Sequence, residues 1–161
     1  MKVHEGAHLR NLALVGHGHA GKTTLVSAML YTAGAAPRLG RVDDGSAITD
    51  YDEEEIARKM SISTGLACVE WGKTEPDKVK INLLDTPGFN MFVHEAKMVL
   101  PVVDAALVVV DGVAGVEVVT QRVWNYCNDM YILCSGWTNL DYAQPWCVYT
   151  PRLPWLVPLS S

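Results

Sequence analysis

The eight residues GHGHAGKT at positions 16–23 fit the pattern GxxxxGK followed by Ser or Thr, which constrains the fold of this chain more than any other stretch. A short apolar run at residues 9–15 precedes the pattern, and residues 22–33 behind it repeat apolar side chains at helical spacing. This pattern indicates a phosphate-binding loop only where it follows a strand and precedes a helix, and both elements are expected here. It therefore predicts a loop that holds phosphate groups with backbone N–H groups and a helix amino terminus.

Within this loop, Lys22 is predicted to reach the β- and γ-phosphates of a nucleoside triphosphate as a catalytic residue, and the Thr23 hydroxyl to ligate Mg²⁺. The alternative is a glycine-rich turn with an accidental Lys-Thr pair. A metal site formed by His17 and His19 is a further alternative. The residues expected to contact the nucleotide are Gly16, His17, Gly18, His19, Ala20, Gly21, Lys22, Thr23 and Thr24.

The residues Asp85-Thr86-Pro87-Gly88 follow a second apolar run at residues 79–84. Alone, DxxG is a common turn, but beside a phosphate loop it predicts a second part of the same site. Asp85 would hold Mg²⁺ through a water and contact the nucleotide. Gly88 has no Cβ to keep its N–H from the γ-phosphate, so it is predicted as a nucleotide-binding and catalytic residue.

Ser61 begins an expected strand directly after a long acidic segment. Its hydroxyl is a candidate third metal ligand beside Thr23 and Asp85, against the alternative of an ordinary exposed serine. The preceding segment, residues 37–59, shows clustered acids and little periodicity. It is predicted to be a long mobile loop, with a solvated run of acidic side chains at residues 50–55.

Strands and helices are expected to alternate up to about residue 129, which predicts an α/β fold with a mostly parallel sheet and flanking helices. The continuous apolar run at residues 105–110 is typical of a central parallel strand buried on both faces. The other expected strands are 61–71 and 79–84, and the later helices are 89–100 and 116–128.

Composition narrows the function classes. A net charge of −5 argues against binding nucleic acid by charge alone, and no direct sequence-specific nucleic-acid contact is expected. Four cysteines without a CxxC pair argue against zinc. The amino-terminal MKVHEGAHLR lacks the apolar core of a signal peptide, and the longest apolar runs are too short to span a bilayer. We therefore expect a cytoplasmic protein with reduced thiols and no membrane partner.

Residues 130–161 differ in character. Asp141 and Arg152 are their only charged residues, and Trp and Pro recur without helical or strand period beyond residues 131–134. The sequence thus predicts two parts, a domain at residues 1–129 and an irregular tail at residues 130–161.

Four stretches together resemble the amino-terminal GTPase domain of translation elongation factor G, and more closely a divergent branch of elongation-factor-G-like proteins. They are GHGHAGKTTL, RLGRVDDGSAITDYDEEEIARKMSI, LLDTPGFNMF and DAALVVVDGVAGVEVVTQRVW, and the likeness ends at about residue 129. The resemblance implies a P-loop GTPase fold that binds GTP or GDP with Mg²⁺. It also implies that the full-length parent works on the ribosome in translocation or recycling. Ser61 stands at the family's magnesium-binding threonine.

Three departures from that family matter. Phe89 stands where the family usually has a histidine that orients the attacking water, so hydrolysis is expected to be poor although binding is retained. His19 stands where many members have aspartate. The Asn-Lys-x-Asp motif that binds the guanine edge is absent from the sequence, as is a later Ser-Ala turn that closes the base pocket.

The resemblance therefore implies a GTPase fold that is incomplete on its carboxyl-terminal side, as in a truncated or frame-shifted product. The strand at residues 105–110 would then have an unpaired edge, unless residues 131–134 pair there by chance. Two alternatives remain for the function. The chain is an inactive fragment, or it is a partner-binding module that uses the Trp-rich tail.

Overall fold

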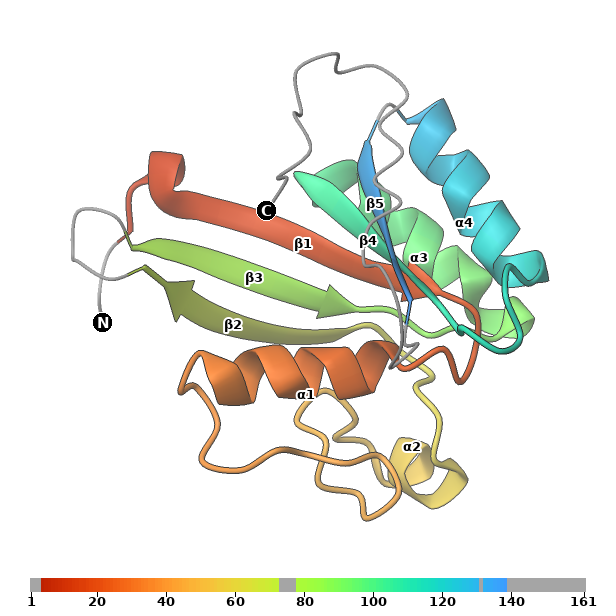
Figure 1. Ribbon diagram of the computed structural model, residues 1–161, viewed down its shortest axis with the longest axis horizontal. Coiled ribbons are helices and arrows are strands. Elements are labelled where there is room, and N and C mark those ends of the chain that lie inside the picture. Colours follow the sequence, from red (N-terminus) through yellow and green to blue (C-terminus); the bar gives the residue numbers. More distant parts are fainter. Residues whose placement is uncertain (1–3, 73–77, 131, 139–161) are drawn as a thin grey trace.

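The computed structural model describes residues 4–72, 78–130 and 132–138, and these form one sheet in the order β2-β3-β1-β4-β5 (Figure 1). Neighbouring strands are parallel except β2, which runs antiparallel to β3. This arrangement confirms the predicted α/β fold with a mostly parallel sheet. The strands are β1 (Leu9–Gly16), β2 (Gly65–Trp71), β3 (Val79–Asp85), β4 (Ala105–Val110) and β5 (Leu133–Thr138).

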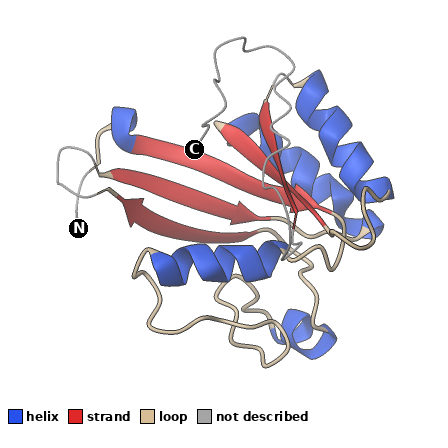
Figure 2. Ribbon diagram, in the orientation of Figure 1, coloured by secondary structure: helices blue, strands red, loops and turns tan. Residues whose placement is uncertain are grey.

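Helices flank both faces of the sheet (Figures 1 and 2). Helix α1 lies on one face, and helices α3 and α4 lie together on the other. The α-helices are α1 (Lys22–Thr32), α2 (Glu53–Arg58), α3 (Val93–Val99) and α4 (Val118–Asp129), and short 3-10 turns occur at η1 (Gly6–His8), η3 (Asn90–Phe92) and η4 (Leu100–Val102). Among the described residues, no helix is long and apolar enough to cross a membrane.

Two separate cores form because side chains along a strand alternate between the faces of the sheet. In β1, Ala13 and Val15 pack with α3 and α4, whereas Leu14 between them packs with α1. All three side chains are fully buried. The central strand is therefore apolar on both faces, and its carboxyl end is held rigidly where the glycine-rich loop begins.

Strand β5 covers the edge of β4 that was expected to be unpaired. Its register runs from Ala105 opposite Leu133 to Val110 opposite Thr138, so the pairing extends past residue 134. Cys134 is buried in the core that α3 and α4 form. A parallel ladder uses backbone groups, which explains why a segment without a strand-like side-chain pattern can still pair. Most of the tail predicted at residues 130–161, namely residue 131 and residues 139–161, lies outside the described residues.

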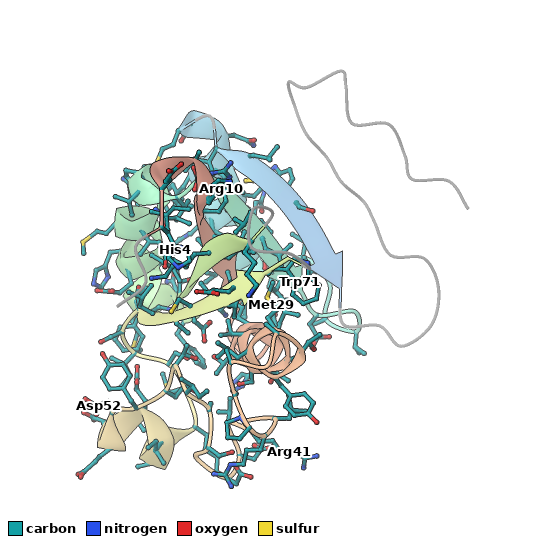
Figure 3. All side chains as sticks on the ribbon, turned by 90° about the vertical axis from the view of Figure 1, so that its left-hand side faces the viewer. His4, Arg10, Met29, Arg41, Asp52 and Trp71 are labelled. Atoms are coloured by element: carbon teal, nitrogen blue, oxygen red, sulfur yellow. The ribbon has the colours of Figure 1, made fainter. Side chains whose placement is uncertain are left out.

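The expectation of a structureless acidic loop at residues 37–59 is wrong for its second half, which contains α2. Asp52 caps this helix, and its side chain accepts a hydrogen bond from the Glu54 N–H while Glu55 reaches back to the Asp52 N–H. The spacing Asp52-x-x-Glu55 is a capping box, which the sequence analysis missed. Figure 3 shows the segment that carries Arg41 and Asp52 on the opposite side of α1 from the sheet.

Candidate nucleotide-binding site

The loop between β1 and α1 is shaped by residues that allow unusual backbone angles. Gly21 has φ +92° and stands directly before α1, and His19 has φ +64°, which is uncommon for a residue other than glycine. Gly16 packs against the Val109 carbonyl so closely that a Cβ would collide with it. The loop therefore depends on glycine at both ends, and it leads into the positive end of the α1 dipole.

Lys22 lies inside this loop with 6% of its surface exposed, and its Nζ donates a hydrogen bond to the His17 carbonyl at 2.7 Å. Burial lowers the pKa of Lys22 to about 8, while the charges of Asp85 and Asp50 act in the opposite direction. An ammonium group shielded from solvent is stabilised by a nearby negative charge, and a phosphate group held in the loop would supply that charge.

Hydroxyl and carboxylate groups meet beside the first turn of α1. The Oγ1 of Thr23 lies 3.2 Å from the Oγ of Ser61, which donates to Asp50 Oδ1 at 2.7 Å. Thr49 Oγ1 donates to Asp85 Oδ2 at 2.7 Å, and a hydrogen bond from Thr23 also helps to hold the pKa of Asp85 down. The structure thus brings together the three predicted metal ligands, Thr23, Ser61 and Asp85.

Two carboxylate oxygens in this cluster have no hydrogen-bond partner among the described residues. They are Asp50 Oδ2 and Asp85 Oδ1, and both are buried. Burial raises the pKa of Asp85 to about 6 and also raises the pKa of Asp50. A cation at this place would compensate both oxygens, because unpartnered buried carboxylates are costly.

The donor set fits Mg²⁺. Two hydroxyls and two carboxylates are all oxygen ligands, and Mg²⁺ is usually bound by one or two carboxylates together with waters and substrate phosphates. The described residues contain no group of three or more His, Cys, Asp or Glu side chains that could hold a metal. A site that combines few protein ligands with phosphate oxygens does not require such a group.

Gly88 lies directly on the phosphate loop. A Cβ at this position would be 2.5 Å from the Gly18 nitrogen and from the His17 carbonyl carbon, and closer still to Lys22 Nζ. The approach is fixed by Thr86, whose N–H and hydroxyl both donate to the Leu14 carbonyl, at 3.2 and 2.7 Å. The end of β3 is therefore joined to β1, and glycine is required where the two loops meet.

A cavity of about 490 Å³ opens at this place, within the usual size range of ligand pockets. Seven of the predicted site residues line it: His19, Gly21, Lys22, Thr23, Thr24, Ser61 and Gly88. The remaining lining residues are Arg41, Val42, Asp43, Asp50, Arg58, Lys59, Met60 and Phe89. The predicted residues that do not line this cavity are Gly16, His17, Gly18, Ala20 and Asp85.

Two acidic residues that were assigned to a solvated run are buried instead. Asp50 is 4% exposed and joins the oxygen cluster, and Glu55 is 3% exposed. Glu55 Oε1 accepts hydrogen bonds from the N–H groups of Ile62 and Ser63, at 2.8 and 3.0 Å, and so holds the chain on which Ser61 sits. The capping-box spacing could have revealed Glu55, but nothing in the sequence distinguishes Asp50 from its exposed acidic neighbours.

The fold and the loop geometry define an α/β domain with a P-loop. The family model of the elongation factor Tu GTP-binding domain matches residues 7–134, and the chain belongs to this family. The resemblance to an elongation-factor-G-like translational GTPase domain is thereby confirmed. The match also extends a few residues past the predicted limit of residue 129.

Curated relatives include proteins named "Ribosome-releasing factor 2, mitochondrial". The one from Scheffersomyces stipitis is 39% identical over 130 residues, which cover 81% of this chain and 15% of the relative. The one from Saccharomyces cerevisiae strain S288c is 39% identical over 126 residues, which cover 78% of this chain and 15% of the relative. The chain therefore spans about 15% of the length of these relatives.

Solved structures show the same fold. A crystal structure of a Thermus thermophilus protein superposes with a TM-score of 0.74 at 39% identity, over 83% of this chain and 19% of that one. A bacterial selenocysteine-specific elongation factor superposes with a TM-score of 0.61 at 22% identity, over 80% of this chain and 19% of that one.

Proposed function

We propose that this chain binds GTP or GDP together with Mg²⁺ and hydrolyses GTP slowly, as the GTPase domain of an elongation-factor-G-like translation factor. The observation that carries the proposal is the oxygen cluster of Thr23, Ser61, Asp50 and Asp85, with its two unpartnered carboxylate oxygens, beside the buried ammonium of Lys22. Family membership supports the choice of a guanine nucleotide.

In this proposal each side chain has a defined task. Lys22 leaves the His17 carbonyl and binds the β- and γ-phosphates, and the Gly88 N–H approaches the γ-phosphate. Thr23 and Ser61 hold the metal directly, and Asp85 holds it through a water. When bound, Mg²⁺ neutralises charge on the phosphate oxygens. Asp50 accepts a hydrogen bond from the Ser61 hydroxyl and so orients that hydroxyl, which also places a second carboxylate beside the metal site.

Affinity is expected to be weak. Hydrogen bonds to a charged group contribute about 1.5–3 kcal/mol each, so a site without the two bonds of an Asn-Lys-x-Asp aspartate loses about 3–6 kcal/mol. This corresponds to roughly a 10²- to 10⁴-fold loss, which moves a micromolar dissociation constant to about millimolar. Preference for guanine over adenine should largely vanish.

Binding of a fluorescent GTP analogue, with and without Mg²⁺, tests the proposal. Saturable binding that Mg²⁺ strengthens is expected, with similar competition by GTP, GDP and ATP. Lys22→Ala should abolish binding, whereas Lys97→Ala on the distant helix α3 should leave it unchanged. Absence of saturable binding would favour the inactive-fragment alternative. Competition by GTP and GDP with no effect of ATP would contradict the predicted loss of guanine selectivity.

For the full-length parent that the family resemblance implies, the partner we propose is the ribosome, because relatives of this chain are named as ribosome-releasing factors. Co-sedimentation of that protein with ribosomes in the presence of a non-hydrolysable GTP analogue tests this. The cytoplasm is the compartment expected from the sequence, while the mitochondrial relatives argue for the mitochondrion. Imaging a fluorescent fusion against a mitochondrial marker distinguishes the two compartments.

A further inference from the structure

His19 is a phosphate-loop residue whose side chain has no role in the proposal above. Its side chain is exposed, and it lines the cavity beside Lys22, Gly88 and Phe89. No hydrogen bond joins its ring to another residue in the described part of the chain. An imidazole without a hydrogen bond to the described residues therefore lies at the cavity that would receive the phosphates.

Phe89 determines where that imidazole lies. The two ring centroids are 5.3 Å apart with an interplanar angle of 88°, an edge-to-face arrangement that aromatic rings favour. Phe89 also rests on the loop itself, since a Cβ at Gly18 would meet three of its ring atoms at 3.0–3.2 Å. Gly18, Phe89 and His19 thus form one stack, in which the missing side chain of Gly18 makes room for the phenyl ring.

The stack is held next to the place expected for the γ-phosphate. Gly88, the residue before Phe89, lies on the loop within reach of Lys22 Nζ and the Gly18 nitrogen. An attacking water at this place needs a hydrogen-bond acceptor. The ammonium of Lys22 can only donate hydrogen bonds, and the phenyl ring of Phe89 can neither donate nor accept one. A neutral imidazole, in contrast, accepts a hydrogen bond through one of its nitrogens.

Building on the proposed function, we propose that His19 is a catalytic residue of GTP hydrolysis, whose neutral imidazole accepts a hydrogen bond from the attacking water and orients it. The water oxygen forms a bond to the γ-phosphorus, and the bond from that phosphorus to the β–γ bridging oxygen breaks. GDP leaves with the electron pair, and the proton of the water passes to a γ-phosphate oxygen to give inorganic phosphate. Phe89 is a positioning residue that holds the His19 ring.

The test compares hydrolysis with binding in the full 161-residue chain. Single-turnover release of phosphate from GTP is measured with the protein in excess, and the dissociation constant of a fluorescent GTP analogue is measured in parallel. His19→Ala should slow hydrolysis by roughly 10²-fold or more, the range given by loss of a side chain that handles the reacting proton, and change the dissociation constant less than about threefold. His94→Ala, at an exposed histidine on α3, is the matched control and should change neither quantity.

Two further variants separate chemistry from loop conformation. His19→Gly suits the left-handed backbone at this position and should lose the rate as fully as His19→Ala does. His19→Gln keeps a hydrogen-bond acceptor at this position and should retain part of the rate that His19→Ala loses. A loss confined to His19→Ala, or a glutamine variant that hydrolyses GTP no faster than His19→Ala, would assign the effect to loop geometry and overturn the proposal.

The remaining outcomes distinguish this inference from the function on which it rests. If the unsubstituted chain binds GTP but does not hydrolyse it, or if His19→Ala hydrolyses it at the unsubstituted rate, the role of His19 is refuted and nucleotide binding stands. If the unsubstituted chain shows no saturable binding, the proposed function is refuted, and the role of His19 with it.

Discussion

At the scale of single residues, His19 and Lys59 combine a side chain with a left-handed backbone, at φ +64° and φ +52°. Such angles cost a residue with a Cβ about 1–2 kcal/mol relative to glycine. Lys59 ends helix α2, and its N–H bonds to carbonyls of that helix. It occupies a position that glycine commonly takes at helix ends.

We therefore expect Lys59→Gly to raise the free energy of unfolding by about 1 kcal/mol. Chemical denaturation of the two proteins measures this difference. Lys59→Ala removes the same charged side chain but keeps the backbone strain, so it should show no such gain. Equal stabilisation by both substitutions would mean that the charge of Lys59, and not its backbone angle, is unfavourable.

Asp85 makes the stability of the nucleotide-free chain depend on pH. Its pKa is about 6 when folded, above the usual value of 3.8, because of burial. The folded state thus binds the proton more tightly than the unfolded state, and this contribution to stability, fully present below pH 3.8, is lost as the pH rises through about 6.

Asp85→Asn removes this titration. The unsubstituted chain loses this stability as the pH rises, and the variant does not. The free energy of unfolding of the variant minus that of the unsubstituted chain should therefore increase by about 2 kcal/mol between about pH 4 and pH 7. Urea denaturation at several pH values, without nucleotide or Mg²⁺, gives the comparison. A difference that is constant over this pH range would show that the Asp85 carboxyl has no raised pKa.

The residues of the phosphate loop and of the Asp85–Gly88 turn could be singled out in the sequence because spacing alone carries their signal. Asp50 could not, because its role follows from burial against Ser61 and Lys22 rather than from any local pattern.

At the scale of secondary-structure elements, Glu55 joins helix α2 to the residues that lead into β2. Its carboxylate accepts hydrogen bonds from the N–H groups of Asp52, Ile62 and Ser63. Helix α2 is too short to be stable alone, so its position depends on such contacts. The Ser61 hydroxyl is consequently placed by an acidic side chain from a different element.

Glu55→Ala should release this segment while leaving the sheet intact. Amide hydrogen exchange at residues 52–63 should become at least about tenfold faster, because buried hydrogen bonds to a charged acceptor contribute about 1.5–3 kcal/mol. Glu53→Ala, at an exposed residue of the same helix, is the control and should have little effect. Faster exchange throughout β1 and β3 would show that Glu55 supports the whole domain instead.

The sequence predicted β1, α1, β4 and α4 well, because apolar periodicity and the glycine-rich loop delimit them. It missed α2 because clustered acids suggested solvent exposure, while the Asp52–Glu55 capping pair was overlooked. Helix α3 is also shorter than residues 89–100, since 3-10 turns occupy both of its flanks.

At the scale of the whole molecule, the two outer strands of the described sheet are the antiparallel strand β2 and the parallel strand β5. The sequence predicted the parallel core but left the β5 position open. Side chains of its residues show little strand pattern, and their pairing follows from the exposed ladder of β4. Cys134 connects this last strand to the core shared by α3, α4 and β1.

Cys134→Asp should therefore destabilise the domain by about 3 kcal/mol or more, because it buries an unpaired charge. Leu133→Asp is the matched control, since Leu133 is 38% exposed, and it should cost less than about 1 kcal/mol. Thermal unfolding with light scattering measures both stability and aggregation. Equal effects of the two substitutions would indicate that β5 contributes little to the folded domain.

The sheet order also has a consequence for folding of the chain while it is being synthesised. The first strand synthesised, β1, is central, and both of its neighbours, β3 and β4, come much later in the chain. Leu9 pairs with Lys80, so at 5–20 residues per second β1 waits about 4–14 s for its first partner. During that interval the apolar β1 segment has no strand to pair with, so we expect chaperones that act on nascent chains to bind it.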